Sequence, residues 1–211
     1  MTRGRFITLE GGEGAGKSTQ LRLLADSLSA CGIDVVLTRE PGGSPGAEEI
    51  RRLLVSGETG RWGGMTEALL HTAARRDHLE RTVWPALEAG RWVLCDRFFD
   101  STMAYQGYGL GLGREPIEAL QRVALGDFQP DLTLILDLPV EAGLERANAR
   151  RGGEDRYERM DLSFHARLRD GFLDIAAREP ERCAVIDAAH PVEVVQAAIL
   201  DAVTRRLTLA A

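Results

Sequence analysis

The segment Gly11-Gly-Glu-Gly-Ala-Gly16-Lys17-Ser18 constrains this chain more than any other feature. It fits the pattern G-x-x-x-x-G-K-[ST], lies directly after an apolar run typical of a strand, and leads into a helical pattern. In that setting glycines let successive backbone N–H groups turn toward a phosphate chain, at a helix N-terminus whose partial positive charge favours anions. With this chain's composition, chance gives roughly one such match in a thousand. The segment therefore predicts a phosphate-binding loop between a strand and a helix.

The loop also contains the single lysine of the sequence. Lys and Arg together number 26, and all of them except Lys17 are arginines. A preference for arginine codons explains why lysine is scarce, but not why the one lysine stands here. A slim ammonium group at this place can reach the β- and γ-phosphates of a nucleotide, and the Ser18 hydroxyl suits Mg²⁺. The residues expected to bind the nucleotide are Gly11, Gly12, Glu13, Gly14, Ala15, Gly16, Lys17, Ser18 and Thr19.

Short apolar runs alternate with helical patterns along the whole chain, which is typical of a parallel sheet with crossover helices. Strands are predicted at 6–9, 35–37, 92–95, 132–136 and 184–186, and helices after the loop and at 65–87, 139–150, 162–178 and 192–207. The expected fold is α/β, a three-layer P-loop NTPase-like domain with a central five-stranded parallel sheet flanked by helices. Residues 1–211 form one domain, because no linker or internal repeat divides them.

Composition excludes several classes of protein. The net charge of −6 argues against a non-specific nucleic-acid binder or a membrane-surface protein. No apolar run approaches the length that a bilayer requires. Three distant cysteines form no zinc-ligand pattern and fit a reducing compartment, and Met1–Phe6 leads into the first strand without a secretory signal. A cytoplasmic protein is expected. Guanine-specific switches need an Asn-Lys pair, whereas the single asparagine, Asn148, is followed by Ala149.

Three stretches rich in glycine or charge, at 39–46, 107–113 and 150–159, fit either solvated loops or functional loops. A second candidate site follows the apolar strand at 92–95, where Asp96 and Arg97 come in succession. In an open α/β sheet, ligands bind outside the carboxyl ends of the strands, so these residues should lie beside the phosphate loop. Asp96 suits a Mg²⁺ role and Arg97 a bidentate grip on a phosphate. A structural ion pair between the two would look the same.

The continuation of this segment, from Leu94 through Asp96-Arg97 to Ser101-Thr-Met-Ala-Tyr105-Gln106, resembles the signature of thymidylate kinases, and the resemblance covers nearly the entire chain. It also includes the phosphate loop, Thr38-Arg-Glu-Pro-Gly-Gly43, Ala73-Ala-Arg75, Gly126-Asp-Phe-Gln-Pro-Asp-Leu-Thr133, Asp155-Arg156 and Ile186-Asp-Ala188. The pattern is closest to the bacterial type, in which a lid supplies catalytic arginine. The resemblance implies transfer of the γ-phosphoryl group of ATP to dTMP, giving dTDP and ADP, with Mg²⁺ and in a homodimer whose interface could use Leu69, Leu70 and Ala73–Ala74.

By position, the resemblance implies roles for individual residues. Glu13 would meet the sugar 3′-hydroxyl, Arg51 and Arg97 would hold the phosphate, and Tyr105 would crowd the 2′ position. Arg75 would bond the thymine ring. The other residues expected on the substrate side are Arg39, Glu40, Ser101, Thr102 and Gln106. The sequence departs from the family where His71 replaces the phenylalanine that stacks on thymine. Imidazole can stack and also hydrogen-bond, so affinity or pH dependence should change.

Without the resemblance, several of these residues have plain structural interpretations. Arg75 is followed by Arg76 and Asp77, a pattern that alone favours a solvated helix face. Arg51 beside Arg52 is similarly ambiguous, and Tyr105 could belong to the core. Two other functions remain open: another P-loop nucleotide or nucleoside kinase, and a nucleotide-binding module without catalysis.

The expected reaction brings two phosphate groups together, so the protein must supply cations. Lys17 and Arg97 are the expected catalytic residues at the loop and strand. Residues 150–158 form the expected lid, one residue longer than the bacterial pattern, from which Arg150, Arg151 or Arg156 would reach the transferred group. No general base is required, because the attacking phosphate oxygen is already ionised.

Overall fold

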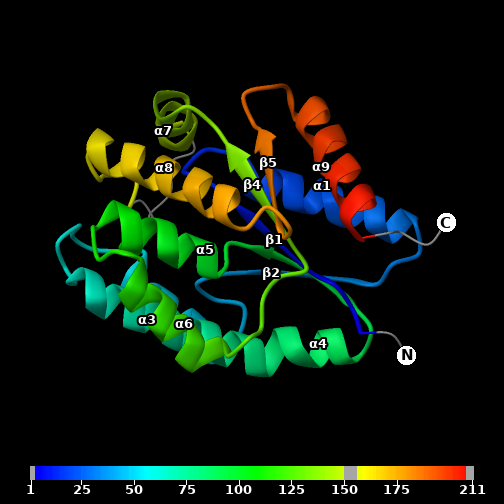
Figure 1. The fold of residues 1–211 in the computed structure, drawn as a ribbon, viewed down its shortest axis with the longest axis horizontal. Coiled ribbons are helices and arrows are strands. Elements are labelled where there is room, and N and C mark those ends of the chain that lie inside the picture. The colour runs from blue at the N-terminus through cyan, green and yellow to red at the C-terminus, as the bar shows by residue number, and fades with distance from the viewer. Residues whose placement is uncertain (1–2, 150–155, 208–211) are drawn as a thin grey trace.

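The computed structural model describes residues 3–149 and 156–207. Its centre is a parallel sheet of five strands in the order β2-β3-β1-β4-β5 (Figure 1). The strands are β1 (Phe6–Glu10), β2 (Val35–Arg39), β3 (Trp92–Asp96), β4 (Leu132–Asp137) and β5 (Cys183–Asp187). The five-stranded parallel sheet predicted from the sequence is confirmed. Each strand extends past its predicted end to a charged residue, so five charged side chains stand along one edge of the sheet.

Two apolar cores lie on opposite faces of the sheet. In β1, Phe6 belongs to one core, whereas Ile7 and Leu9 belong to the other. The central strand β1 is buried along its whole length, whereas the edge strands β2 and β5 are partly exposed. This pattern follows from helices covering both faces.

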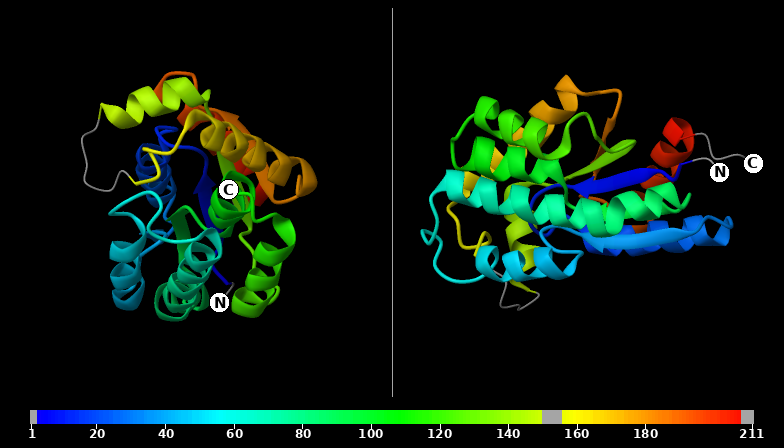
Figure 2. Two further views of the ribbon diagram at one scale, coloured as in Figure 1. Left: turned by 90° about the vertical axis from the view of Figure 1, so that its left-hand side faces the viewer. Right: turned by 90° about the horizontal axis from the view of Figure 1, so that it is seen from below.

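Helices α1 (Lys17–Ala30) and α9 (Val192–Leu207) pack together against one face of the sheet (Figure 1). The opposite face is covered by α3 (Gly64–His78), α4 (Trp84–Glu88), α5 (Phe99–Thr102), α6 (Arg114–Leu125) and α8 (Leu162–Arg178). Figure 2 shows these layers from two further sides. α2 (Pro45–Leu54) packs on α3, and α7 (Val140–Asn148) packs on α8. The predicted helices at 162–178 and 192–207 have these bounds in the structure.

The predicted helix at 65–87 is one continuous helical segment with a π-helical turn, η1 (Leu79–Val83), between α3 and α4. Pro85 follows within α4, where its ring would press on the carbonyl group of Arg81 in a regular α-helix. The wider turn over Arg81 relieves that contact. A second π-helical stretch, η2 (Met103–Gly109), continues α5. Such stretches occur often at functional sites, and η2 contains Tyr105 and Gln106.

Two of the three presumed loops are more ordered than a solvated loop. Between β2 and α2, Glu40 and Ser44 are buried. The stretch 107–113 begins inside η2, where Gly107 and Gly109 are buried. Helices α2, α5 and α6 and the π-helical stretch η2 were not predicted from the sequence. Over the described residues, no helix combines the length and the apolar character that crossing a membrane requires.

Candidate functional site

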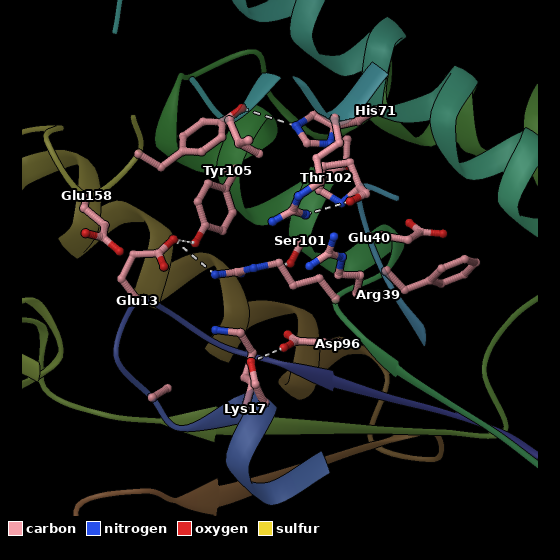
Figure 3. Close-up of a pocket in the computed structure, with 18 of the residues that line it drawn as sticks. Glu13, Lys17, Arg39, Glu40, His71, Asp96, Ser101, Thr102, Tyr105 and Glu158 are labelled. Atoms are coloured by element: carbon pink, nitrogen blue, oxygen red, sulfur yellow. Dashed lines mark hydrogen bonds and ion pairs between the residues drawn. The ribbon is translucent and has the colours of Figure 1, made fainter. Parts of the chain in front are cut away.

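A cavity of about 260 Å³ opens at the carboxyl edge of the sheet, where the charged strand ends meet the phosphate loop. Figure 3 shows Lys17 and Asp96 at one end of it, His71 and Thr102 toward the other, and Glu13 and Tyr105 between. The predicted site residues that line it are Glu13, Gly14, Ala15, Gly16, Lys17, Ser18, Arg39, Glu40, Arg51, His71, Arg75, Asp96, Arg97, Ser101, Thr102, Tyr105 and Gln106. Among the described residues, the predicted ones outside the lining are Gly11, Gly12, Thr19 and Arg156.

The phosphate loop curls around the Lys17 side chain. The Lys17 ammonium group donates to the carbonyl oxygens of Gly11 at 3.0 Å and Gly12 at 2.7 Å. Gly14 has a φ of 69°, and a Cβ there would stand 2.0 Å from the Gly143 carbonyl oxygen, so no other residue fits. Burial and the nearby Arg97 lower the pKa of Lys17 to about 8, against the opposing effect of nearby carboxylates. The ammonium group is therefore held where it is electrostatically unfavourable until an anion arrives.

Ser18 and Asp96 form a pair of oxygen ligands beside the loop. The Ser18 hydroxyl donates to Asp96 Oδ2 at 2.5 Å, joining the start of α1 to the end of β3. Within the described ranges, no cluster of three or more acidic, histidine or cysteine side chains could hold a metal. Mg²⁺ in nucleotide sites is commonly held by one or two protein oxygens together with phosphate and water, and this pair fits that pattern.

Arg97 is held in a left-handed backbone conformation with a φ of 70°, which is uncommon for a residue with a side chain. Its guanidinium donates to the Gly11 carbonyl oxygen at 3.0 Å and pairs with Glu13 at 3.1 Å. Asp96 is bonded to Ser18 instead, so the alternative of an Asp96–Arg97 ion pair is wrong. Arg97 turns away from its sequence neighbour and into the cavity.

Glu10, which was not predicted as a site residue, supports this conformation. It is fully buried at the end of β1, where its two oxygens accept from the backbone N–H of Phe98 at 2.7 Å and the Ser101 hydroxyl at 2.5 Å. Both partners follow Arg97 within four residues of the sequence. Burial, with help from Asp100, raises the pKa of Glu10 to about 7. In the sequence, the feature that could have indicated this role is a carboxylate that directly follows an apolar strand.

Glu13 and Tyr105 meet in the middle of the cavity. The Tyr105 hydroxyl donates to Glu13 Oε1 at 2.5 Å. Burial would raise the pKa of Glu13, but Arg97, Lys17 and the bond from Tyr105 together hold it below its usual value. Glu13 is therefore a carboxylate and acts as an acceptor. The Tyr105 ring also packs edge-on against Phe164 and Phe172, so this residue belongs both to the core and to the cavity wall.

Arg75 is buried, with 3% of its surface exposed, so the interpretation as a solvated helix face is wrong. Its guanidinium donates to Glu40 Oε2 at 2.7 Å and, through Nη2, to the Phe98 carbonyl and the Thr102 hydroxyl at 3.0 Å. No bond among the described residues uses Nη1. The other oxygen of Glu40 is 2.9 Å from Nδ1 of His78. Arg75 thus keeps a donor for a ligand while its charge is neutralised within the protein.

Beyond Arg75, the cavity ends in a group of polar side chains. Gln106 Nε2 donates to Glu67 Oε2 at 3.1 Å and lies 3.3 Å from the Tyr157 hydroxyl, whereas Gln106 Oε1 is buried without a partner among the described residues. Nε2 of His71 lies 3.2 Å from the same hydroxyl. Burial, then Arg75 and Arg97, lowers the pKa of His71 to about 3. His71 is neutral near pH 7 and cannot supply the pH dependence expected from its sequence.

Two arginines stand at the rim. Arg39 is exposed and pairs with Glu48 at 3.2 Å, and Arg51 donates to the Pro41 carbonyl oxygen at 2.7 Å.

The geometry of this cavity agrees with the known proteins that the chain resembles. The family model described as Thymidylate kinase matches residues 9–199. A thymidylate kinase from Caulobacter vibrioides is 60% identical over 209 residues, which is 99% of this chain and all of that protein. One from Bradyrhizobium is 58% identical over 97% of this chain and 92% of its own length. The chain belongs to the thymidylate kinase family. The crystal structure of thymidylate kinase from Ehrlichia chaffeensis, at 37% identity, superposes with a TM-score of 0.79 over 96% of this chain and 99% of that one.

For this thymidylate kinase family member, the structure corrects one predicted catalytic residue. Arg156, expected to swing toward the transferred group, is 2% exposed and lies outside the cavity. It pairs with Glu67 and donates to the carbonyl oxygens of Leu54, Glu58 and Thr59. Reaching a phosphate would break all of these bonds, so Arg156 is a fixed anchor. Arg150 and Arg151, the other predicted lid arginines, lie outside the described residues.

The cavity or support residues that had escaped sequence reasoning include the polar side chains of Glu10, Glu67, His78, Tyr157 and Glu158 and the apolar Pro41, Val55 and Phe98. Tyr157 and Glu158 directly follow Arg156, so the end of the expected lid lines the cavity. In the sequence, Tyr157 is marked only by its place next to an arginine in a charged segment. That pattern does not distinguish a residue that lines the cavity from one exposed to solvent.

Proposed function

We propose that this protein transfers the γ-phosphoryl group of ATP to dTMP, giving dTDP and ADP, as a step in the synthesis of dTTP. A single cavity joins a nucleotide phosphate loop at one end to a buried hydrogen-bonding surface at the other. The similarity to thymidylate kinases supports this acceptor over other nucleotides and over a module without catalysis.

The base end of the cavity carries the choice of thymine. Arg75 offers a donor through Nη1, and Gln106 offers an acceptor through its unpartnered Oε1. Thymine presents the matching pair, a carbonyl oxygen at C4 and an N–H at position 3. Cytosine presents an amino group and a bare nitrogen at these places, which would leave buried polar groups unpaired. The His71 ring supplies a face for stacking.

The acceptor phosphate would lie between Arg97 and Arg51, with Arg39, Glu40 and Ser101 shaping that side. Glu13, as a carboxylate, would accept a hydrogen bond from the sugar 3′-hydroxyl. The Tyr105 hydroxyl, 2.5 Å from Glu13, would then occupy the space that a 2′-hydroxyl needs. This arrangement favours deoxyribose.

ATP would place its phosphates on the loop from Gly11 to Thr19, where Lys17 and the backbone N–H groups face the anion. Ser18 and Asp96 are the residues that would hold Mg²⁺ there, and the ion supplies neutralisation of phosphate charge. Lys17 exchanges its carbonyl partners for phosphate oxygens, which also restores a favourable setting for its charge.

In the transfer, a phosphate oxygen of dTMP attacks the γ-phosphorus and forms the new P–O bond as the bond to the β-phosphate oxygen breaks. ADP leaves, and no proton has to be removed, because the attacking oxygen is already ionised. Arg97 and Lys17 offset the repulsion between the two phosphate groups. Arg150 or Arg151 would add a third cation from the lid, which would also keep water from the γ-phosphoryl group.

We also propose a cytoplasmic homodimer, in line with the resemblance. Its interface would use the outer surfaces of α3 and α6, where Leu69 is 50% exposed and Val123 is 85% exposed. Ala73 is exposed on the same surface, but Ala74 is buried in the core and cannot take part.

The function is tested by measuring ADP release from purified protein with ATP, Mg²⁺ and each of dTMP, dUMP, CMP and GMP. We expect dTMP to give the highest kcat/KM. A higher value for any of the other three would show that the acceptor has been assigned wrongly.

A further inference from the structure

Glu67 lies in the first turn of α3 with only 1% of its surface exposed. Its two carboxylate oxygens face different parts of the site. Oε1 accepts from Arg156, and Oε2 accepts from Gln106 at 3.1 Å and from the Tyr157 hydroxyl at 3.0 Å. A buried carboxylate with this many donors is held in one position. Glu67 does not line the cavity, so it acts on a ligand only through its neighbours.

The Glu67 carboxylate decides how Gln106 presents its amide. A carboxylate accepts hydrogen bonds and cannot donate them, so the Gln106 NH₂ group must face Glu67. The carbonyl oxygen Oε1 of Gln106 is then the atom left without a partner among the residues that the structure describes, and it stays an acceptor. Without the negative charge of Glu67, the amide could turn over and present a donor instead.

The same carboxylate decides the proton position on His71. Tyr157 has one hydroxyl proton, and the acceptor-only Glu67 takes it. The Tyr157 oxygen can then only accept, and Nε2 of His71 lies 3.2 Å from it. His71 must therefore carry its proton on Nε2. The ring plane is fixed by this bond.

Arg156 holds the Glu67 side chain in place. The arginine donates to the carbonyl oxygen of Leu54 at the end of α2 and to those of Glu58 and Thr59 between α2 and α3, and its Nη2 also donates to Glu67. It also stacks over the Tyr157 ring, at 5.2 Å from the ring centroid. The end of the expected lid is thereby fastened to the base pocket.

We propose that Glu67 is the positioning residue that sets the hydrogen-bonding pattern of the base pocket, by orienting the Gln106 amide and, through Tyr157, fixing the Nε2–H tautomer of His71. This proposal rests on the proposed function, because it assigns the base pocket to thymine. It makes Glu67 a determinant of base selectivity without contact to the base.

The first test replaces Glu67 with Gln, which keeps the shape but removes the charge. We expect the preference for dTMP over dCMP, as a ratio of kcat/KM values, to fall about tenfold, equivalent to ~1.4 kcal/mol. KM for dTMP should rise more than kcat falls. Glu80→Gln, the same change at an exposed residue of the same continuous helical segment, is the matched control. It should change neither the selectivity ratio nor KM for dTMP. A folded Glu67→Gln protein with unchanged selectivity would overturn the proposal.

Because Glu67→Gln leaves Arg156 without its counter-charge and could unfold the protein, Tyr157→Phe supplies an independent test. The nitrogen-15 NMR signals of His71 in the nucleotide-free wild-type protein should show the proton on Nε2. In Tyr157→Phe this proton should exchange faster with solvent, and KM for dTMP should rise at nearly constant kcat. Tyr108→Phe, at a tyrosine outside the cavity lining, is the control.

A wild-type His71 protonated on Nδ1, or an exchange rate unaffected by Tyr157→Phe, would refute the proposal. This readout needs no substrate. If the protein failed to phosphorylate dTMP, the proposed function would fall while the NMR result still decided the role of Glu67.

Discussion

The two ends of the cavity differ in how their positively charged side chains are paired with carboxylates. At the phosphate end, the hydrogen bonds of Lys17 to other described residues go only to neutral carbonyl oxygens, and its pKa is lowered to about 8. At the base end, Arg75 is matched by Glu40, and Arg156 is matched by Glu67. Both of these pairs are buried. The contrast rests on Lys17, because Arg97 at the same end already pairs with Glu13. Lys17 is ready for an anion, whereas both arginines of the base end are neutralised before any ligand arrives.

This difference separates the tasks of the two ends. An arriving phosphate gains from charge that the protein has not already satisfied. A nucleobase is neutral, and an unmatched arginine beside it would be costly to bury. We therefore expect the base end to select by its pattern of donors and acceptors. Substitutions at the phosphate end should lower turnover, and those at the base end should alter stability or selectivity.

The largest effect is expected at Lys17. In Lys17→Arg the planar guanidinium does not fit the loop that encloses the ammonium group, so kcat should fall about 10³-fold while the melting temperature stays within a few degrees. Steady-state kinetics and thermal unfolding measure both. The exposed Arg22→Lys change is the matched control and should leave kcat unaltered. A fully active Lys17→Arg enzyme would contradict the role assigned to Lys17 at the phosphate end of the cavity.

Arg156→Ala should act on stability rather than on chemistry. Removing one partner of a buried ion pair costs about 3–4 kcal/mol, because Glu67 would keep an uncompensated charge. Urea unfolding measures this loss. At the exposed Arg205–Asp201 pair, Arg205→Ala should cost less than about 1 kcal/mol. Unchanged stability with a large fall in kcat would restore Arg156 as a catalytic arginine.

Glu10 gives the phosphate end a dependence on pH. Its pKa is about 7 in the folded protein, against an ordinary value of 4.5 for a glutamate in the unfolded chain. Between these values the folded state binds the proton more tightly, so stability falls as pH rises from 4.5 to 7. The fall amounts to about 2–3 kcal/mol. Glu10→Gln removes this contribution, and the difference in unfolding free energy between the two proteins should follow that pH window. A difference independent of pH would contradict the assignment.

The smallest effect is expected at Tyr105, between the two ends. Tyr105→Phe keeps the ring packed on Phe164 but removes the hydroxyl bonded to Glu13. The preference for dTMP over the ribonucleotide of thymine should fall about tenfold, as ~1.4 kcal/mol of discrimination is lost. Competition kinetics with the two nucleotides measure it. Retention of the full preference would assign the discrimination to another residue.

The sheet could be predicted from the sequence because each strand is an apolar run, but the predictions ended at the last apolar residue. The structure adds a charged residue to each strand, and two of these residues, Arg39 and Asp96, line the cavity, while Glu10 supports Arg97 from behind it. Helix α2 was missed although Ser44 and Pro45 supply a typical start. α6 was missed although Ile117 and Ala124 mark a buried face.

The arginines show why the rest could not be predicted. The residues around Arg75 alone favoured a solvated helix face, although the resemblance placed Arg75 in the site, and Arg75 is buried. Arg156 was expected to be mobile and is anchored. Each owes its place to a carboxylate far away in the chain: Glu40 lies 35 positions from Arg75, and Glu67 lies 89 positions from Arg156. Spacing along the sequence carries no information about such pairs. The short phosphate-loop motif needs no distant partner, and its placement between β1 and α1 was predicted correctly.

The central claim is that one end of the cavity binds phosphate by charge and the other end selects the base by hydrogen bonding. The most direct test of this claim follows a labelled phosphoryl group. ATP labelled with phosphorus-32 at the γ-position would be incubated with the protein, Mg²⁺ and an equimolar mixture of dTMP and dCMP, and the products separated. We expect the label to appear in dTDP, with little in dCDP or in inorganic phosphate. Label found mainly in dCDP would contradict the selection at the base end, and label found mainly in inorganic phosphate would contradict phosphoryl transfer itself.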